Sequence, residues 1–379
     1  MNQARVYAMA LLASAVVALN AHAVEPMVGN PGIKSIEAIA FGPDGLLLIG
    51  DGKGAQVVAI YTEDLAAVKW TKTEIADIRG HLAAKLGTDA KGIEIIKLAV
   101  NPVSQKAYIA VRKTDSGPQG SRLQHILLTL DGSGKVAEFS FEKVKHNCFP
   151  LNDVGEKSSV NYVSDIAWAG DRILVATTAG EKFMSKIFSI LPKRAEAVCY
   201  STETFHVAHN QWETKAPIRT VIPYEQAGKR YLVGAFTCTP IVKYALEDMK
   251  PNAQVKGESV IELGYGNAPQ DMFIYEKDGK SYILMNTVRM KGFQAKDPVG
   301  PSPYWTCKID YGILAETANI NEKALKRHGA KANESKTDRA VVVPSFHGVA
   351  HMDRLDATRA VVIRDDDKGG MSLAVLALP

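Results

Sequence analysis

The sequence has few cysteines, and they stand far apart. Cys148, Cys199, Cys238 and Cys307 are the only four in 379 residues. No two of them have the Cys-x-x-Cys spacing, which argues against zinc ribbons, thioredoxin-like redox sites and c-type haem attachment. The sequence also lacks a Gly-x-Ser-x-Gly motif, which argues against the nucleophile elbow of an α/β-hydrolase.

The sequence also lacks a marked excess of charge of either sign. Lys and Arg together number 45 and Asp and Glu 41, which leaves a formal net charge of +4. There is no basic stripe interleaved with aromatic residues, so we expect no nucleic-acid partner. With 46% hydrophobic and 23% charged residues, the composition is that of a globular chain with a large core.

Long apolar runs are missing except at the N-terminus. Arg5 precedes an apolar run over residues 6–19, and Ala21-His22-Ala23 has the small-x-small pattern of a signal-peptidase site. These features predict a signal peptide over residues 1–23 and a single mature domain over residues 24–379. The run is too short for a membrane anchor, so we expect a periplasmic or secreted protein without a membrane span.

What the sequence does contain is a weak repeat of an apolar strand, a tight turn and a second apolar strand. Turns such as Pro43-Asp44-Gly45 favour chain reversal, because glycine accepts a positive φ and aspartate caps its own turn. The six expected strand pairs are 35–41 with 46–50, 93–100 with 107–111, 163–168 with 173–177, 218–224 with 231–236, 272–275 with 282–285, and 349–355 with 360–363.

Six such repeats predict an all-β fold, a six-bladed β-propeller of four-stranded blades. The last repeat is one strand short, and we expect the mature N-terminal segment, residues 24–33, to supply that strand and close the ring. Two short helical insertions interrupt the pattern. Residues 74–86 have apolar side chains at helical spacing after Thr73 as a cap, and residues 319–328 form the second.

Propeller topology places the unusual residues on one face. The loops between blades and the loops from second to third strands share that face, opposite the short first-to-second-strand turns, and long loops on a rigid scaffold commonly carry function. The same layout puts Cys148 near Cys199 and Cys238 near Cys307, so these two disulfides are predicted for an oxidising compartment. The candidate ligand-binding residues on these loops are Asn286, Arg289 and Trp212.

The first strand of each blade begins at this loop face and lines the central channel. The polar residues near these starts are Glu37, Glu94, Asp165, Arg219, Asp271 and His351. Converging carboxylates repel one another unless a cation compensates them, and calcium accepts an irregular set of oxygen ligands. The sequence therefore predicts a cation, calcium first, held by Glu37, Asp165 and Asp271. In the alternative interpretation, these side chains bind ordered water or pair with Arg219 and Lys97.

Two histidine pairs offer a second kind of site. His206 and His209 are three residues apart, and His347 and His351 are four apart, spacings that can bring two imidazoles together. Because imidazole suits copper and zinc, His206 and His209 are candidate ligands for such an ion. The alternative is that these histidines hydrogen-bond to loop backbone and cap exposed strand ends.

Short motifs carry a family resemblance. Ile36-Glu37-Ala38-Ile39-Ala40-Phe41, followed by Leu46-Leu47-Leu48-Ile49-Gly50-Asp51, resembles the first blade of SMP-30/gluconolactonase-like hydrolases, and the chain as a whole resembles secreted bacterial six-bladed propellers, NHL-type repeats included. This resemblance implies that Glu37 is a metal ligand. A later family blade, similar to residues 269–287, has an Asn ligand near Asp271 and a catalytic Asp near Asn286. This sequence departs at both positions, and Asn286 cannot act as a general base.

These features predict an exported propeller that binds a small ligand on its loop face. If it is catalytic, the expected chemistry is metal-assisted hydrolysis, with His351 or His347 moving the proton. Two alternatives stay open: a non-catalytic module that docks another exported protein, and a redox or copper-handling propeller.

Overall fold

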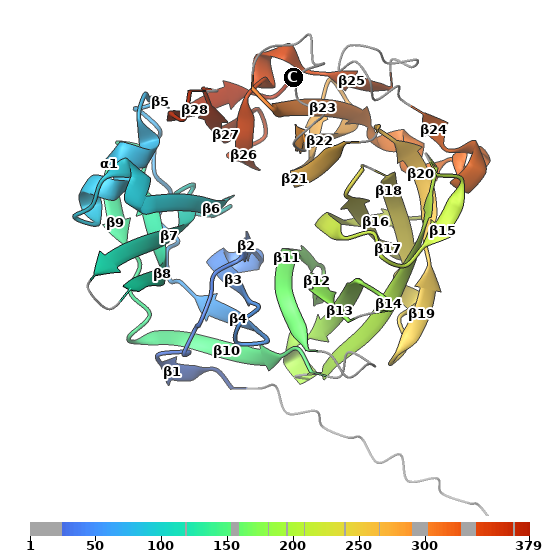
Figure 1. Ribbon diagram of the computed structural model, residues 1–379, viewed down its shortest axis with the longest axis horizontal. Helices are drawn as coiled ribbons and strands as arrows, with labels where there is room; N and C mark the ends of the chain where they lie inside the picture. The colour runs from blue at the N-terminus through green and yellow to red at the C-terminus, as the bar shows by residue number, and fades with distance from the viewer. Residues whose placement is uncertain are drawn as a thin grey trace, which may run out of the picture.

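The computed structural model is a ring of six β-sheets around a central channel, and the four principal strands of each sheet are antiparallel to their neighbours (Figure 1). It describes residues 25–117, 120–152, 159–180, 182–194, 196–207, 209–238, 240–264, 266–289, 302–326, 339–366 and 368–379. The predicted signal peptide lies outside these residues. The all-β, six-bladed propeller predicted from the sequence is confirmed, and each blade is named below by its innermost strand.

Every blade runs outward from the channel through four principal strands. The β2 blade contains β2 (Ala38–Phe41), β3 (Leu46–Asp51), β4 (Gln56–Tyr61) and β10 (Val144–Pro150), with the additional strand β1 (Met27–Gly29). The β6 blade contains β6 (Ile93–Val100), β7 (Ala107–Gly117), β8 (Gly120–Leu130) and β9 (Val136–Glu138). The β11 blade contains β11 (Val160–Ala169), β12 (Arg172–Ala179), β13 (Ser185–Leu191) and β14 (Glu196–His206), with the additional strands β15 (Gln211–Glu213) and β19 (Ala253–Lys256).

The other half of the ring has the same plan. The β16 blade contains β16 (Ile218–Gln226), β17 (Lys229–Phe236), β18 (Pro240–Ala245) and β20 (Glu258–Glu262), with the additional strand β24 (Leu325–Lys326). The β21 blade contains β21 (Asn267–Lys277), β22 (Lys280–Arg289), β23 (Tyr304–Asp310) and β25 (Ala340–Val342). The β26 blade contains β26 (Val349–Arg354), β27 (Arg359–Asp365), β28 (Met371–Ala377) and β5 (Glu74–Ile75).

The tight turns between first and second strands form where the sequence predicts them. Asp44 and Gly45 have φ values of 54° and 70°, and Asp278 and Gly279 have values of 53° and 71°. A pair of left-handed residues matches the twist of the two strands it connects, and Asp-Gly adopts it at low cost. The six predicted strand pairs are all present as the first two strands of the six blades.

The blades do not follow one another around the ring in chain order. β2 lies between β6 on one side and β11 on the other (Figure 1). After the β6 blade, the chain therefore passes back behind the β2 blade and continues in the opposite sense through the β11, β16, β21 and β26 blades. The ring closes where β26 contacts β6.

Two outer strands are exchanged at this reversal. β10, which follows the β6 blade in the chain, is the fourth strand of the β2 blade and pairs with β4. β5, which precedes the β6 blade, is the fourth strand of the last blade, where Ile75 pairs with Leu373 of β28. The first, second and last blades are thus tied together by strands from outside their own repeats.

The prediction that the N-terminal segment closes the ring is wrong. Residues 27–29 form β1, which pairs with β10 at the outer edge of the first blade, and the missing strand of the last blade is β5. Burial explains the choice. Ile75 is 6% exposed in the core that surrounds β28, whereas Met27 and Val28 are 58% and 74% exposed.

One of the two predicted helical insertions is an α-helix. α1 (Ile78–Lys85) lies within the predicted range, but Asp77 rather than Thr73 caps it, by accepting a hydrogen bond from Gly80 N. The second insertion is not an α-helix in its described part, residues 319–326, which form 3-10 turns and β24; residues 327–328 lie outside the described part. The 3-10 turns are η1 (Pro43–Gly45), η2 (Ala90–Gly92), η3 (Pro192–Arg194), η4 (Leu246–Asp248), η6 (Tyr311–Ala315), η7 (Thr317–Asn319), η8 (Asn321–Lys323) and η9 (Pro344–Phe346).

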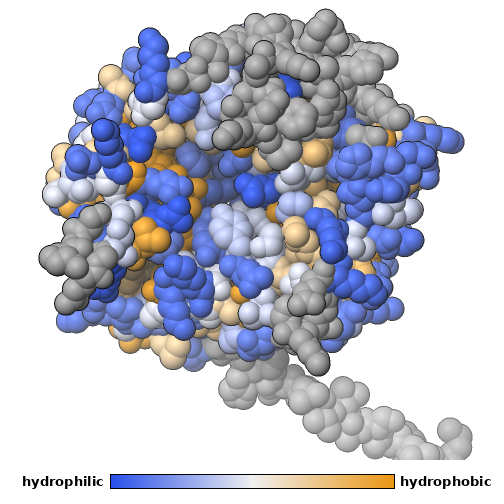
Figure 2. Space-filling model, in the orientation of Figure 1, coloured by the Kyte–Doolittle hydropathy of each residue, from blue (hydrophilic) through white to orange (hydrophobic). Residues whose placement is uncertain are grey.

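The apolar core lies between neighbouring blades. Val57 of β4 and Val175 of β12, for example, pack into one buried cluster although they belong to different blades. The face of the ring shown in Figure 2 is largely hydrophilic, and its hydrophobic residues gather mainly to the left of the centre. Within the described ranges, no helix has the length and apolar character needed to cross a membrane.

Candidate functional site

β-Bulges near the loop end of the inner strands decide which side chains reach the channel. Five inner strands, counted over the described residues, shift register there: β6, β11, β16, β21 and β26. An extra residue in one strand re-aims the side chains that follow it. In β6 the shift lies between Ile95 and Lys97, so Lys97 enters the channel, while the predicted Glu94 is exposed and pairs with Arg112.

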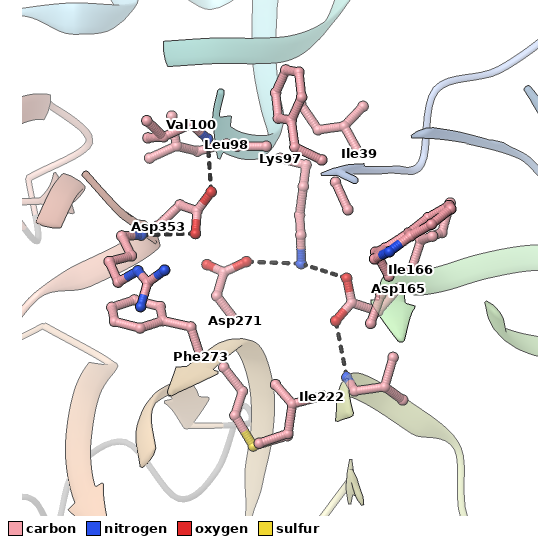
Figure 3. Close-up of a pocket in the computed structure, with 18 of the residues that line it drawn as sticks. Ile39, Lys97, Leu98, Val100, Asp165, Ile166, Ile222, Asp271, Phe273 and Asp353 are labelled. Atoms are coloured by element: carbon pink, nitrogen blue, oxygen red, sulfur yellow. Dashed lines mark hydrogen bonds and ion pairs between the residues drawn. The ribbon is translucent and has the colours of Figure 1, made fainter. Parts of the chain in front are cut away.

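A buried lysine joins two carboxylates across the channel (Figure 3). Lys97 Nζ lies 2.8 Å from Asp271 Oδ1 and 3.3 Å from Asp165 Oδ1. It also donates a hydrogen bond to the backbone oxygen of Gln270, at 3.1 Å. The three charged side chains come from three different blades and are at most 11% exposed.

The two carboxylates keep this lysine charged. Burial by itself lowers the pKa of Lys97, but the negative charges of Asp165 and Asp271 and their hydrogen bonds outweigh that effect and raise it above its usual value. The ammonium is therefore a permanent cation at the centre of the ring. This is the alternative interpretation of the sequence, in which channel carboxylates pair with Lys97 instead of a metal ion.

Carboxylates at the inner strands also connect neighbouring blades at four of the six blade boundaries. In each case a carboxylate oxygen accepts a hydrogen bond from backbone N–H of the neighbouring inner strand. The four carboxylate-to-backbone pairs are Glu37 with Val163 N (2.8 Å), Asp165 with Val221 N (2.9 Å), Asp271 with Met352 N (3.0 Å) and Asp353 with Val100 N (2.7 Å). These bonds fix the blades around the channel and occupy one oxygen of each predicted metal ligand.

The carboxylates predicted to hold calcium do come together, but their surroundings do not fit a calcium ion. Asp165 and Asp271 already share the charge of Lys97. Glu37 accepts hydrogen bonds from Val163 N and Ser35 Oγ, and burial raises the pKa of its carboxyl group. A site that attracts calcium would instead present several oxygens whose charge is uncompensated.

The loop end of the channel is nearly closed. A cavity of about 30 Å³ remains there, beside Glu37, Lys97, Tyr162 and Asp271, with His351 on its wall. This is about the volume that one water molecule occupies in the liquid. Among the described residues, this cavity at the channel mouth is too small for the ligand predicted from the sequence.

The turn end of the same channel is open. A cavity of about 410 Å³ lies there, bordered by all six inner strands, with Lys97, Asp165 and Asp271 at its floor. Most of the residues that line it are apolar, Phe41 and Trp168 among them, and polar atoms share the exposed lining with them. A second hollow of about 250 Å³ adjoins it, shares Trp168 and Pro223 with it, and is also lined by Tyr224 and Tyr231.

Asp353 lies on the wall of the larger cavity, above the floor formed by Lys97, Asp165 and Asp271. Burial raises the pKa of its carboxyl group to about 6, although hydrogen bonds from Val100 N and Arg354 N act in the opposite direction. The nearby charge of Asp271 adds to the increase. Asp353 thus accepts and releases a proton in the mildly acidic range and stands beside a ligand-sized space (Figure 3).

The two histidines proposed to move protons have different positions. His351 lies on the wall of the small cavity, with Nδ1 4.0 Å from Asp271 Oδ2, and burial lowers the pKa of its imidazole. His347 is half-buried in the turn before β26 and is not among the described residues that line either channel cavity. The structure brings only His351 to the channel.

Three residues predicted to bind ligand have packing roles. Asn286 is fully buried, accepts a hydrogen bond from Asp271 N and donates to the backbone oxygens of Val349 and Ala350. Arg289 is 3% exposed, with its guanidinium 5.9 Å from the centre of the Trp305 ring. Trp212 packs edge-on against Phe205. Within the described part of the chain, none of these three residues lines either channel cavity.

His206 and His209 are brought together, as their spacing suggested. Their rings lie 4.2 Å apart between centroids, and both hydrogen-bond to Glu213. This cluster stands at the loop face, at the end of β14, away from the channel.

The predicted disulfides are not formed. All four cysteines are in the described part of the chain, and no disulfide joins any of them. Cys148 packs into the core between the β2 and β6 blades, whereas Cys199 packs into the core between the β2 and β11 blades. The two thiols therefore face different cores, because nearness to one blade boundary does not ensure that two side chains point toward each other.

Sequence reasoning missed Asp353 and gave Lys97 only as an alternative partner. A signal for Lys97 was present, since it is the single cation within the apolar strand 93–100. Asp353 lies two positions after His351, which the sequence analysis does name as a channel residue. Residues two apart lie on the same side of a strand. Neither residue could be assigned a partner before the blade order was known.

Comparison with known proteins gives only distant structural similarity. The chain matches no known family model, and no curated protein is similar enough in sequence to be a relative. Among solved structures, it is similar to a GH43 endo-arabinanase from Bacillus licheniformis (TM-score 0.35, 15% identity, covering 72% of this chain and 90% of that one). It is also similar to the native arabinanase of Bacillus subtilis (0.34, 10%, 76% and 95%) and to a GH32 β-fructofuranosidase from Bombyx mori (0.33, 10%, 78% and 64%).

The propeller resemblance drawn from the sequence is confirmed at the level of the fold by the ring of six sheets itself. The narrower resemblance to NHL and SMP-30/gluconolactonase-like proteins has no matching family to support it. TM-scores of this size identify neither functional residues nor a ligand.

Proposed function

We propose that this protein binds a short carbohydrate, or a similarly hydroxylated small molecule, in the cavity at the turn end of its channel. The observation that carries the proposal is the cavity of about 410 Å³, bordered by all six inner strands. Its size falls within the range of roughly 300–1,000 Å³ that is usual for small-molecule sites. A rigid ring of strands supplies a pre-formed space, which lowers the entropic cost of binding.

The lining of the cavity suits a hydroxylated ring. The Asp353 carboxylate on the cavity wall offers acceptors for hydroxyl groups. Trp168 stands between this cavity and the smaller aromatic hollow, where Tyr224 and Tyr231 extend the apolar surface. Flat aromatic faces pack well against apolar ring faces while polar groups at the rim fix orientation.

This proposal moves ligand binding from the loop face to the turn face. It also takes binding, without a metal-assisted step, as the primary function, because Lys97 already compensates Asp165 and Asp271. Export remains part of the proposal on the strength of the N-terminal pattern alone. N-terminal sequencing of protein recovered from the periplasm or the medium tests it, and an intact Met1 terminus there would contradict it.

The binding site is tested by isothermal titration calorimetry with a panel of monosaccharides, disaccharides and polyols. Wild type is compared with Trp168→Ala and with Trp212→Ala, a half-buried tryptophan on the opposite face that serves as the matched control. We expect Trp168→Ala to weaken binding of the best compound at least about 10-fold, a loss of about 1.4 kcal/mol. Binding lost with Trp212→Ala and kept with Trp168→Ala would return the site to the loop face, and no binding by wild type would overturn the proposal.

A further inference from the structure

A compact cluster of two histidines and two glutamates stands apart from the channel. β14 continues beyond its blade and pairs with β15 in a hairpin, in which His206 pairs with Gln211 and Thr204 with Glu213. The turn folds back tightly, since His209 N donates to His206 O at 3.1 Å and Asn210 has a φ of 54°. Both histidines and Glu213 are thereby gathered on one short hairpin.

The neighbouring blade supplies the fourth member. Phe205 O accepts a hydrogen bond from Ser259 Oγ of β20 at 2.6 Å, which holds the hairpin against the outer strand of the β16 blade. Glu262, at the end of β20, consequently lies with Oε2 3.6 Å from His206 Nε2. Glu262 is 3% exposed and His206 is 3% exposed, so this contact is buried.

The spacing of the ligand atoms matches a metal site. His206 Nδ1 lies 3.0 Å from Glu213 Oε2, and His209 Nδ1 lies 2.6 Å from Glu213 Oε1. One ligand atom from each of these three residues lies within 4.8 Å of the others. A tetrahedral ion with bonds of about 2.0–2.2 Å needs its ligands roughly 3.3–3.6 Å apart, so small side-chain rotations would suffice.

A second observation points to a ligand at this place. His206 Nε2 is buried and makes no hydrogen bond with any described residue, although it faces Glu262. A buried polar atom left without a hydrogen bond costs about 1–3 kcal/mol. Metal-bound histidines typically direct their other ring nitrogen toward a carboxylate that fixes ring orientation, and the contact of His206 with Glu262 has that arrangement.

The local charge favours a cation. The ion pairs of Glu213 with described residues are with His206 and His209, and none is with a lysine or arginine. Burial raises the pKa of the nearby Cys238 thiol, and the negative charges of Glu262 and Glu213 raise it further.

From this geometry we infer that His206, His209 and Glu213 bind one divalent transition-metal ion, with Glu262 as the carboxylate that orients His206. Two imidazoles and a carboxylate are the donor set of zinc and copper, and they disfavour calcium, which takes oxygen ligands alone. His209 is half exposed, so the fourth coordination position faces solvent and is open to water or to an incoming ligand. The site is separate from the cavity proposed for carbohydrate, and either can fail without the other.

The test uses the full chain without an affinity tag, because a histidine tag would bind the same ions. Metal is removed with a chelator, and Zn²⁺ and Cu²⁺ are titrated separately by calorimetry, with mass spectrometry of the metal to count bound ions. We expect one ion per chain for wild type. His209→Ala, a change at a half-exposed side chain, should weaken binding by more than the roughly 10- to 100-fold expected of Glu262→Gln.

Two further variants separate ligation from hairpin structure. Gln211→Ala removes a hydrogen bond to Glu213 at 3.1 Å but no proposed ligand, and it should retain one ion per chain. His81→Ala, on α1, is the matched histidine control and should bind as wild type does. Replacement by Co²⁺ adds a visible absorption band whose intensity reports a tetrahedral site. No stoichiometric ion in wild type, or equal affinity in wild type and His209→Ala with both folded by circular dichroism, would overturn the inference.

Discussion

Lys97 Nζ and Asp271 Oδ1 lie 2.8 Å apart in the middle of the ring, and they join an inner strand of the second repeat to one of the fifth. Because these blades are not neighbours around the ring, the ion pair bridges the channel rather than a blade boundary. The pair also separates a nearly closed loop end from an open turn end. The ion pair therefore connects opposite parts of the ring and forms part of the floor of the open cavity, and both effects can be measured.

Lys97→Met should be strongly destabilising. Removing the ammonium leaves Asp165 and Asp271 buried without compensation, and breaking a buried pair in this way costs about 3–5 kcal/mol. Urea unfolding followed by circular dichroism measures the loss. The matched control is Lys113→Met, whose partner Asp115 is 40% exposed, and it should cost less than about 1 kcal/mol. Equal effects of the two changes would show that the channel pair has no special role.

Asp353 should make the protein less stable as the pH rises from about 4 to about 6. The pKa of this carboxyl group is raised from 3.8 to about 6, so the folded state holds the proton more tightly than the unfolded state. Its contribution is present at low pH and is lost as pH rises through the folded pKa, by up to about 3 kcal/mol. Unfolding free energies of wild type and Asp353→Asn across this range measure it. Asp278→Asn, on an exposed turn, is the control, and parallel profiles for wild type and Asp353→Asn would contradict the assignment.

Asn286→Ala should destabilise the fold whether or not ligand is bound. The amide donates to Val349 O and Ala350 O and accepts from Asp271 N, all inside the protein. Leaving these groups without partners should cost at least about 2 kcal/mol. Asn30→Ala, at an exposed position, should change stability by less than about 0.5 kcal/mol. A stable Asn286→Ala variant that loses only ligand affinity would support a direct binding role instead.

Ring closure by β5 is tested at Ile75. Ile75→Ala removes buried side-chain volume from the core beside β28 and should cost about 2–4 kcal/mol. Val28→Ala changes the exposed β1 strand and should cost less than about 0.5 kcal/mol. Thermal and urea unfolding of both variants measure the difference. The reverse order would mean that the N-terminal segment closes the ring.

The cysteines should titrate as four thiols. The structure contains no disulfide between Cys148 and Cys199 or between Cys238 and Cys307. Protein purified without reductant and unfolded in guanidinium should therefore react with four equivalents of a thiol reagent per chain. Two equivalents or none would mean that disulfides form in the purified protein and that the strands carrying them shift to accommodate the bonds.

Local features of this protein could be predicted from its sequence because they depend on residues close together in the chain. The turn at Asp44-Gly45 requires left-handed backbone, and those two residue types supply it within one hairpin. Apolar runs likewise predict the first and second strands of all six blades, because each pair of strands lies within one short stretch of the chain. The short helix at residues 78–85 lies within the range that the sequence predicts, although Asp77 caps it and Thr73 does not.

The tertiary structure decided which carboxylate meets which partner. The sequence identified Asp165 and Asp271 as channel residues, but a β-bulge turned Lys97 rather than Glu94 toward them. The reversed order of the first two blades likewise made β5, and not the N-terminus, the closing strand. Such outcomes are beyond a local pattern, because the energy of a buried charge is set by atoms about 3 Å away in space that lie far away in the chain.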